Sequence, residues 1–167
     1  LSLVSITLVF FIGNAVGAFL AWKKTPGWIK TIIPATMIFT SVPSMLAGLM
    51  LLYVLSFKLG IFPANGSYGR GVQPGWSFGF IQSVIHHSIL PILSVLVVTF
   101  GYWTLGMRGM MVTVEGEDYM TLAQAKGLNP LYSLYRYMVR NAILPQITAL
   151  ALSMGTLVGG QVLVEYI

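Results

Sequence analysis

The sequence has no cysteine and very few charged residues. Its 167 residues include 9 Lys and Arg and 4 Asp and Glu, so only 8% of the chain is charged. The absence of cysteine excludes disulfides and thiolate chemistry. Soluble domains carry about 25% charged residues, so this chain has too few polar groups to cover a globule. The composition therefore predicts a protein that lies in a lipid bilayer.

Motifs for catalysis, nucleotide binding and metal binding are also missing. The chain has no Gly-x-x-x-x-Gly-Lys-Ser/Thr run, which excludes ATP binding by a P-loop, and it has no Ser/His/Asp set or paired carboxylates in a plausible pocket. His86 and His87 are adjacent. On a helix they would point about 100° apart and could not chelate a metal as residues four apart do. We expect no metal, no cofactor and no catalytic activity in this chain.

Apolar residues dominate what is present. They make up 56% of the chain, and the mean hydropathy is +0.83. They form four blocks, and each block has at least the ~20 residues that a helix needs to cross a bilayer. The predicted fold class is all-α, a polytopic membrane helix bundle. The four predicted spans are about 1–22, 31–57, 84–106 and 142–164, with a Gly- and Pro-rich loop at 58–80 and a polar region at 107–141.

Small residues and prolines within these blocks suggest how the helices pack. The pairs Gly13/Gly17 and Gly155/Gly159 are each four residues apart, a spacing that lets two helices approach closely in lipid. Asn14 is expected to hydrogen-bond a neighbouring helix. Pro43 lies inside the second block, where it removes a backbone hydrogen bond and predicts a kink.

The distribution of basic residues predicts the orientation in the membrane. Seven basic residues lie in one set of loops and two in the other, and short cytoplasmic loops are the ones rich in Lys and Arg. The polar region is therefore expected in the cytoplasm and loop 58–80 outside. Nucleic-acid binding is not indicated, because no continuous basic surface with stacking aromatics is present. The first set is Lys23, Lys24, Lys30, Arg108, Lys126, Arg136 and Arg140, and the second is Lys58 and Arg70.

The polar region reads as two short helices joined by a turn. Tyr119, Leu122, Ala123 and Lys126 fall on one face of a helix. Gly127 stands where a helix ends, because a residue without a Cβ can take the left-handed backbone conformation. The chain restarts at Asn129-Pro130, a good N-cap followed by a residue suited to the first helical position.

A second helix is predicted after this turn. It carries an apolar stripe, with Arg136 and Arg140 off the stripe, which is typical of a helix that lies against an apolar surface. Periodicity alone favours an ordinary amphipathic loop between two spans over a docking element. The predicted stripe is Leu131, Leu134, Tyr135, Met138 and Val139.

The individual residues of this region favour the docking element. The run Ala123-x-Ala125-Lys126-Gly127-Leu128, followed by Arg140-Asn141-Ala142-Ile143-Leu144-Pro145, resembles the cytoplasmic loop of binding-protein-dependent ABC importer permeases. The similarity is to the dipeptide/oligopeptide branch, which also includes nickel transporters. The general pattern Glu-Ala-Ala-x-x-x-Gly is matched only at Ala123 and Gly127, because Thr121 and Leu122 hold its first two positions.

The resemblance implies a type I ABC importer transmembrane domain, here a partial one that lacks helices at both ends. It implies a non-catalytic permease subunit that imports peptides and assembles with ATP-binding subunits, a second permease subunit and an extracytoplasmic solute-binding protein in the cell membrane. The alternative is a self-contained secondary transporter or channel. The residues that the resemblance assigns to ATPase coupling are Tyr119, Leu122, Ala123, Ala125, Lys126, Gly127, Leu128, Asn129 and Pro130.

Overall fold

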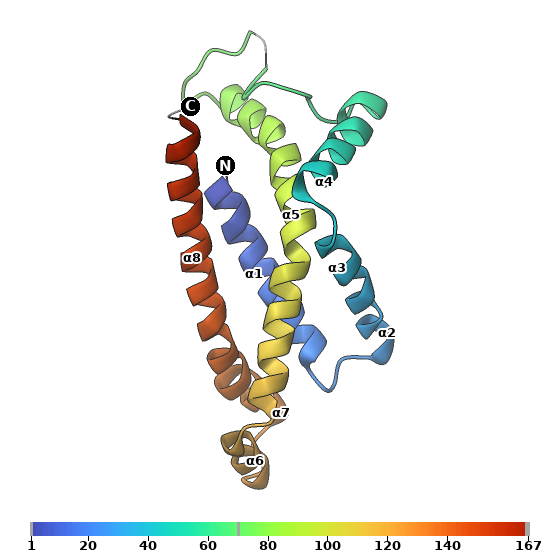
Figure 1. The fold of residues 1–167 in the computed structure, drawn as a ribbon, viewed down its shortest axis with the longest axis vertical. Coiled ribbons are helices and arrows are strands. Elements are labelled where there is room, and N and C mark those ends of the chain that lie inside the picture. Colours follow the sequence, from blue (N-terminus) through green and yellow to red (C-terminus); the bar gives the residue numbers. More distant parts are fainter. Residues whose placement is uncertain (1, 70, 166–167) are drawn as a thin grey trace.

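Long helices running side by side set the architecture of the chain (Figure 1). The computed structural model describes residues 2–69 and 71–165, and it describes side chains except at 2, 39, 44, 45 and 157–165. Within these residues no strand occurs, and the predicted all-α fold is confirmed. The long helices are α1 (Ser2–Ala21), α5 (Phe78–Glu115) and α8 (Arg140–Glu165).

Helices α1 and α5 come into close contact at two glycines. A Cβ on Gly13 would lie 2.7 Å from the Cβ of Trp103, and a Cβ on Gly17 would overlap the carbonyl oxygen of Thr104. Both positions therefore require glycine, as the four-residue spacing predicts. One turn earlier, the ring of Phe10 meets the ring of Trp103 edge to face, with 5.1 Å between centroids. Such pairs add to the stabilisation that comes from burying the rings.

Asn14 is buried beside this contact. Its Nδ2 donates to the carbonyl oxygen of Phe10 in the same helix, at 2.7 Å. The side-chain N–H of Asn14 therefore does not form the expected hydrogen bond to a neighbouring helix. A polar side chain surrounded by apolar groups can donate its hydrogen to the carbonyl oxygen one turn earlier in its own helix, because that oxygen has a second lone pair.

The second apolar block is not one kinked helix, and the prediction for 31–57 needs correction. Its helices stop at Thr40 and restart after Pro43, which takes an extended backbone (φ −56°, ψ 134°). Proline disfavours helical backbone in the residue before it as well as removing a donor, so the helix breaks. The short helix α2 (Gly27–Lys30) precedes the block, and the pieces of the block are α3 (Ile32–Thr40), α4 (Ser44–Leu51) and the π-helix η1 (Leu52–Lys58).

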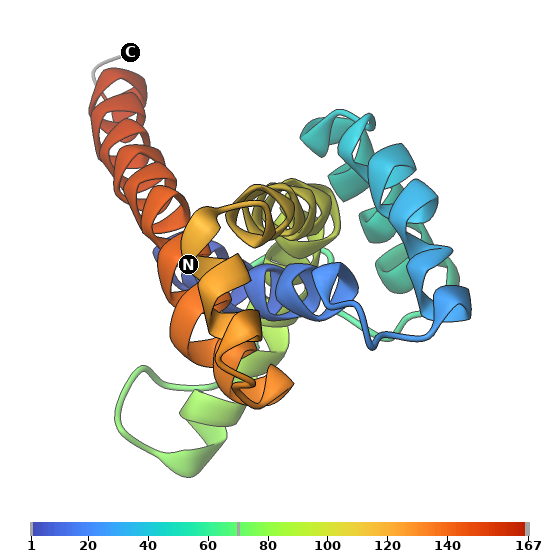
Figure 2. The same cartoon turned by 90° about the horizontal axis from the view of Figure 1, so that it is seen from below.

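Helix α3 approaches α5 at a glycine that the sequence pattern does not single out. A Cβ on Gly101 would lie 2.6 Å from the carbonyl oxygen of Thr36 and would overlap the methyl group of Thr40. Figure 2 shows the result from below: α3 and α4 lie on one side, α8 lies on the other, and α1 and α5 lie between them. Gly101 is isolated in sequence, so no small-residue spacing marks it.

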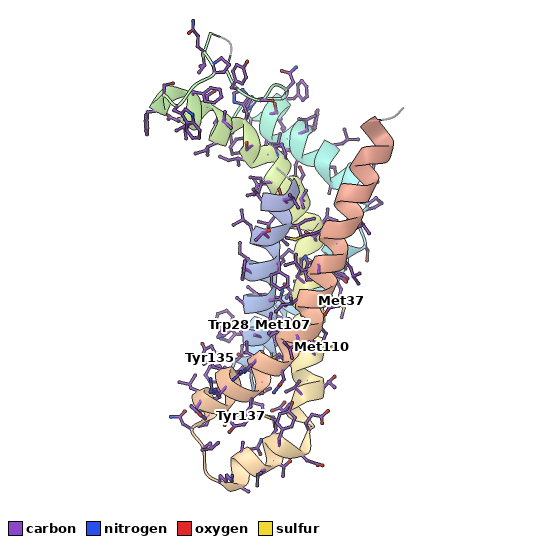
Figure 3. All side chains as sticks on the ribbon, turned by 90° about the vertical axis from the view of Figure 1, so that its left-hand side faces the viewer. Trp28, Met37, Met107, Met110, Tyr135 and Tyr137 are labelled. Carbon is purple, nitrogen blue, oxygen red and sulfur yellow. The ribbon has the colours of Figure 1, made fainter. Side chains whose placement is uncertain are left out.

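Helix α5 is longer at both ends than the predicted span 84–106. Its 38 residues extend about 57 Å, well beyond the ~30 Å core of a bilayer. The side chain of Ser77 caps its start by accepting from the N–H of Phe80 at 3.3 Å, so the irregular loop shortens to 59–77. The first turns lean away from the rest of the helix (Figure 3), as expected with Pro91 inside it.

The predicted small-residue contact of α8 is not found among the described residues. A Cβ on Gly155 would meet nothing within 4 Å, and the side-chain position of Gly159 lies outside the described part of the chain. Helix α8 instead meets α5 at Gly106, where an added Cβ would lie 3.1 Å from Nε2 of Gln146. By length and composition, two helices of the described residues could cross a membrane, Leu3–Ala21 and Phe78–Glu115.

The α1–α5 contact gives a stability prediction. We expect Gly17→Ala to lower the free energy of unfolding by about 1–3 kcal/mol, because the added methyl group overlaps the backbone of α5. Gly109→Ala, on α5 in open space, is the matched control, and we expect it to be neutral or stabilising by up to about 1 kcal/mol. Thermal unfolding in detergent measures both. Equal midpoints for the two variants would contradict the contact.

Candidate functional site

The polar region projects as a helical hairpin from the lower end of the molecule (Figure 1). Its first helix, α6 (Asp118–Ala125), starts after Glu117, whose backbone is extended. Asp118 lies in the first turn, where a negative charge stabilises the positive end of the helix dipole. The chain then returns through α7 (Pro130–Ser133) and the π-helix η2 (Leu134–Val139) into α8.

The turn at the tip of the hairpin is built by Gly127. This residue has φ +66°, the left-handed conformation that the sequence predicts. Its N–H donates to the carbonyl oxygen of Gln124 at 2.9 Å, and the N–H of Leu128 donates to that of Ala123 at 3.2 Å, the two bonds of a Schellman motif. A Cβ on Gly127 would meet nothing within 4 Å. Glycine is therefore required here by backbone conformation and not by space.

The predicted restart of the chain is also confirmed. Asn129 is the N-cap of α7, and its side-chain oxygen accepts from the N–H of Leu131 at 2.9 Å. Pro130 occupies the first helical position, where no donor is needed. A Schellman stop followed at once by a capped start fixes the angle between α6 and α7, so the tip of the hairpin has a defined shape.

The predicted face of α6 needs correction. Ala123 is only 3% exposed and packs inward with Met120, whereas Leu122 is 56% exposed and Tyr119 and Lys126 also face outward. Periodicity places all four predicted residues on one face, but the buried side is the one that carries Met120. Ala123 therefore belongs to the interior of this chain. Of the other predicted coupling residues, Leu128 is half-buried, and Ala125, Gly127, Asn129 and Pro130 are exposed.

The predicted stripe of the second helix is right only in part. Leu134 and Met138 are buried, but Leu131 and Tyr135 are exposed. A π-helix closes its hydrogen bonds five residues apart and has wider turns than an α-helix, so side chains four apart, such as Leu134 and Met138, stay on one face, whereas side chains three apart turn away from each other. In Figure 3, Tyr135 accordingly lies at the outer edge of the lower end. Arg136 is exposed and so is Arg140, as expected.

A methionine-rich cluster holds the hairpin against the long helices. Met107 and Met111 of α5 meet Met120 of α6 and Met138 of η2, and all four side chains are at most 5% exposed. Methionine fills irregular gaps and tolerates rearrangement better than branched side chains do. Sequence reasoning missed this cluster, although the four-residue spacing of Met107 and Met111 is a signal for one helix face. Its other buried members are Leu134 and Ala142, and its half-buried neighbours include Ala18, Ala21 and Trp22 of the α1 end.

An ion pair links the lower ends of α1 and α5 beside the cluster. Lys23 Nζ lies 2.9 Å from Glu115 Oε1, and the lysine is largely exposed. An exposed pair of this kind contributes only about 0–1 kcal/mol, so it orients the chain more than it stabilises it. Next to it is a cavity of about 300 Å³ between the hairpin and the ends of α1 and α5, lined in part by Met120, Gln124 and Leu128.

Tyr119 ties the outer side of α6 to α8. Partial desolvation raises the pKa of the Tyr119 hydroxyl above its usual range, the charge of Glu117 raises it further, and a hydrogen bond with the side chain of Asn141 lowers it. The hydroxyl therefore stays protonated at neutral pH. Asn141 itself donates to the carbonyl oxygen of Tyr137 at 2.7 Å. This chain of bonds adds a polar link to the apolar one made by the methionines.

Exposed apolar side chains remain on the hairpin after this packing. They combine with charges of both signs, since Glu117 and Asp118 lie at the start of α6 and Lys126 lies at its end. An apolar surface with a charged surround is typical of a protein–protein contact. We call these apolar residues the tip surface: Tyr119, Leu122, Leu131, Tyr132 and Tyr135.

No metal site accompanies this surface in the described part of the chain. No three His, Cys, Asp or Glu residues come together there in a way that could hold an ion. The adjacent histidines instead bind backbone, with His86 3.1 Å from the carbonyl oxygen of Ile61 and His87 2.8 Å from that of Ser83.

The comparison with known protein families decides what this arrangement belongs to. Residues 13–167 match the model of the family described as binding-protein-dependent transport system inner membrane component. The chain belongs to this family. The matched residues contain the hairpin, the methionine cluster and the α5–α8 contact, so the whole candidate site lies within the family's domain.

Curated relatives of the family are similar along most of the chain. A probable peptide ABC transporter permease protein of Sinorhizobium fredii, y4tP, is 30% identical over 99% of this chain and 50% of the relative. The oligopeptide transport system permease protein AppB of Bacillus subtilis is 35% identical over 76% and 39%. The di/tripeptide transport system permease protein DppB of Pseudomonas aeruginosa is 28% identical over 100% and 54%. The chain thus spans about half the length of the curated relatives it matches.

The turn geometry gives a prediction about local order. Gly127→Ala places a Cβ in the left-handed conformation, which costs about 1–2 kcal/mol. Since about 1.4 kcal/mol is a factor of ten, we expect the amide of Leu128 to exchange its hydrogen roughly 5- to 30-fold faster. Gly116→Ala is the control, because Gly116 has φ −79°. Unchanged exchange at Leu128 in Gly127→Ala would show that the turn does not depend on this conformation.

Proposed function

We propose that this chain is part of the permease subunit of an ATP-driven importer and that the tip surface docks an ATP-binding subunit. The observation that carries the proposal is the hairpin itself. It combines a fixed turn, an apolar outer face and an inner face clamped to the long helices by the methionine cluster. A loop that only connected two spans would need none of these features.

The membrane arrangement follows from the same proposal. Helices α1, α5 and α8, with the α3–α4 layer, would form one wall of a solute path in the cell membrane, and a second permease subunit would form the other. The hairpin would face the cytoplasm, in agreement with its basic residues, and loop 59–77 would face outside toward a solute-binding protein. A transporter driven by ions is less well supported, because Glu115, Glu117 and Asp118 all lie at the hairpin, which leaves only Glu165 elsewhere.

Peptides are the solute class that the relatives support. The relatives from Sinorhizobium, Bacillus and Pseudomonas are named as peptide, oligopeptide and di/tripeptide permeases. We propose the same class for this chain. Transport would require the partner subunits, since the chain carries no residues for ATP hydrolysis.

Docking is tested best at Leu122, which is exposed and on the outer face of α6. Leu122→Glu would bury an unpaired charge in the contact, and we expect the affinity for the ATP-binding subunit to fall at least about tenfold. Leu59→Glu is the matched control, because Leu59 is 55% exposed at the opposite end of the molecule. The measurement is binding of the purified ATP-binding subunit to the permease in nanodiscs. Wild-type affinity in Leu122→Glu would remove the tip surface from the docking site.

Ala123 is unsuitable for this test. Because Ala123 is buried, a large residue there would displace α6 and would lower binding whether or not a partner touches the site. A loss of binding in Leu122→Glu is free of this ambiguity.

A further inference from the structure

We propose that a pocket at the end opposite the hairpin binds the amino-terminal end of a peptide as it enters the transporter. The proposal rests on the proposed import function and adds to it a site and a ligand chemistry. The pocket has a volume of about 370 Å³ and lies between α4, loop 59–77 and α5. In Figure 1 these elements meet at the top of the molecule, far from α6.

The roof of the pocket is a loop fixed to α5 at several points. The N–H of Gly69 donates to Ser83 Oγ at 2.7 Å, and His86 Nε2 lies 3.1 Å from the carbonyl oxygen of Ile61. The ring of Phe62 also lies against that of His86, with 5.5 Å between centroids. These contacts come from the first part and the middle of the loop, so the pocket beneath it is part of the fold.

Polar groups in the pocket wall are arranged as acceptors. His87 Nδ1 lies 2.8 Å from the carbonyl oxygen of Ser83. Since a carbonyl oxygen can only accept, Nδ1 carries the hydrogen, and Nε2 of the neutral ring remains an acceptor. Ser94 Oγ donates its hydrogen to the carbonyl oxygen of Leu90 at 2.9 Å, so the lone pairs of Ser94 Oγ remain available to accept a hydrogen bond. Pro91 has no N–H, so the carbonyl oxygen of His87 lacks its usual helical donor.

The remaining wall is uncharged and, apart from the side chain of Asn65, apolar. It includes Leu49, Leu52, Leu90 and Pro63, and no Asp, Glu, Lys or Arg lines the pocket among the described residues. A ligand that satisfies these groups must bring N–H donors and an apolar side chain. An anion would find no cation there, and His87 and Ser94 have no spare side-chain N–H, so among the lining side chains only the amide of Asn65 could donate to it. The α-ammonium group of a peptide supplies three donors beside an apolar first residue, and this is the chemistry that fits.

A filled pocket tests the site directly. A Cβ on Gly48 would lie 3.8 Å from Ser94, so Gly48→Ala fits the pocket, whereas Gly48→Phe occupies it. The probe is the dipeptide Leu-Ala, added to the assembled transporter without its binding protein and observed by saturation-transfer NMR. We expect binding to the wild type and to Gly48→Ala, and at least roughly tenfold weaker binding to Gly48→Phe. Equal binding to Gly48→Phe would overturn the site.

The second arm tests the ligand chemistry. N-acetyl-Leu-Ala lacks the ammonium group, and the loss of charge-assisted hydrogen bonds should weaken its binding to the wild type at least roughly tenfold. Equal binding of both peptides would overturn recognition of the amino terminus. Uptake of Leu-Ala by the complete system in vesicles is measured separately. An absence of ATP-dependent uptake with intact NMR binding would count against the proposed function, while leaving the pocket in place.

Discussion

The structure depends on how closely α1 and α5 approach each other. At Gly13 and Gly17 the backbone of one helix touches the other, and no side chain larger than hydrogen fits between them. In lipid there is little hydrophobic gain from joining two apolar helices, so close packing of this kind is what holds them together. The pair then serves as a fixed platform. Helix α3 packs on one side of it at Gly101, and α8 packs on the other at Gly106.

The methionine cluster joins the hairpin to this platform of α1 and α5. Met107 and Met111 belong to the platform, whereas Met120 and Met138 belong to the hairpin, so any movement of one part is felt by the other through this contact. Methionine is suited to such a joint because its side chain can repack without opening a cavity. The adjoining π-helix η2 adds a wide turn at the point where the hairpin enters α8, and π-helical turns are frequent at functional sites.

The parts of the site that the sequence predicts are those fixed by local chemistry. Gly127 and Asn129 determine their own backbone and their own hydrogen bonds, so the turn can be predicted without knowledge of the rest of the chain. The inner face of α6 cannot be predicted in this way. Periodicity shows which residues share a face of the helix, but it does not show which face another helix will cover. The sequence pattern therefore places Ala123 on the outer face, although Met120 and the platform draw it inward.

Helix packing can likewise be predicted only in part. The glycine pairs Gly13/Gly17 and Gly155/Gly159 have one spacing, yet Gly17 touches α5 and Gly155 touches nothing among the described residues, whereas the isolated Gly101 forms a tight contact. Spacing describes a surface that can pack and leaves the neighbour unspecified. Likewise Pro43 predicts a disturbance, but whether the helix bends or stops depends on what the two halves pack against.

The central claim is that the platform holds the hairpin in place through the methionine cluster, and a spin label on α6 tests it most directly. The sequence has no cysteine, so Thr121→Cys gives one labelling site, on the exposed side of α6. The claim predicts that Met111→Ala, which empties part of the cluster, makes the label more mobile, and that Met50→Ala, at a methionine 68% exposed on α4, does not. Identical spectra for the two variants would contradict it.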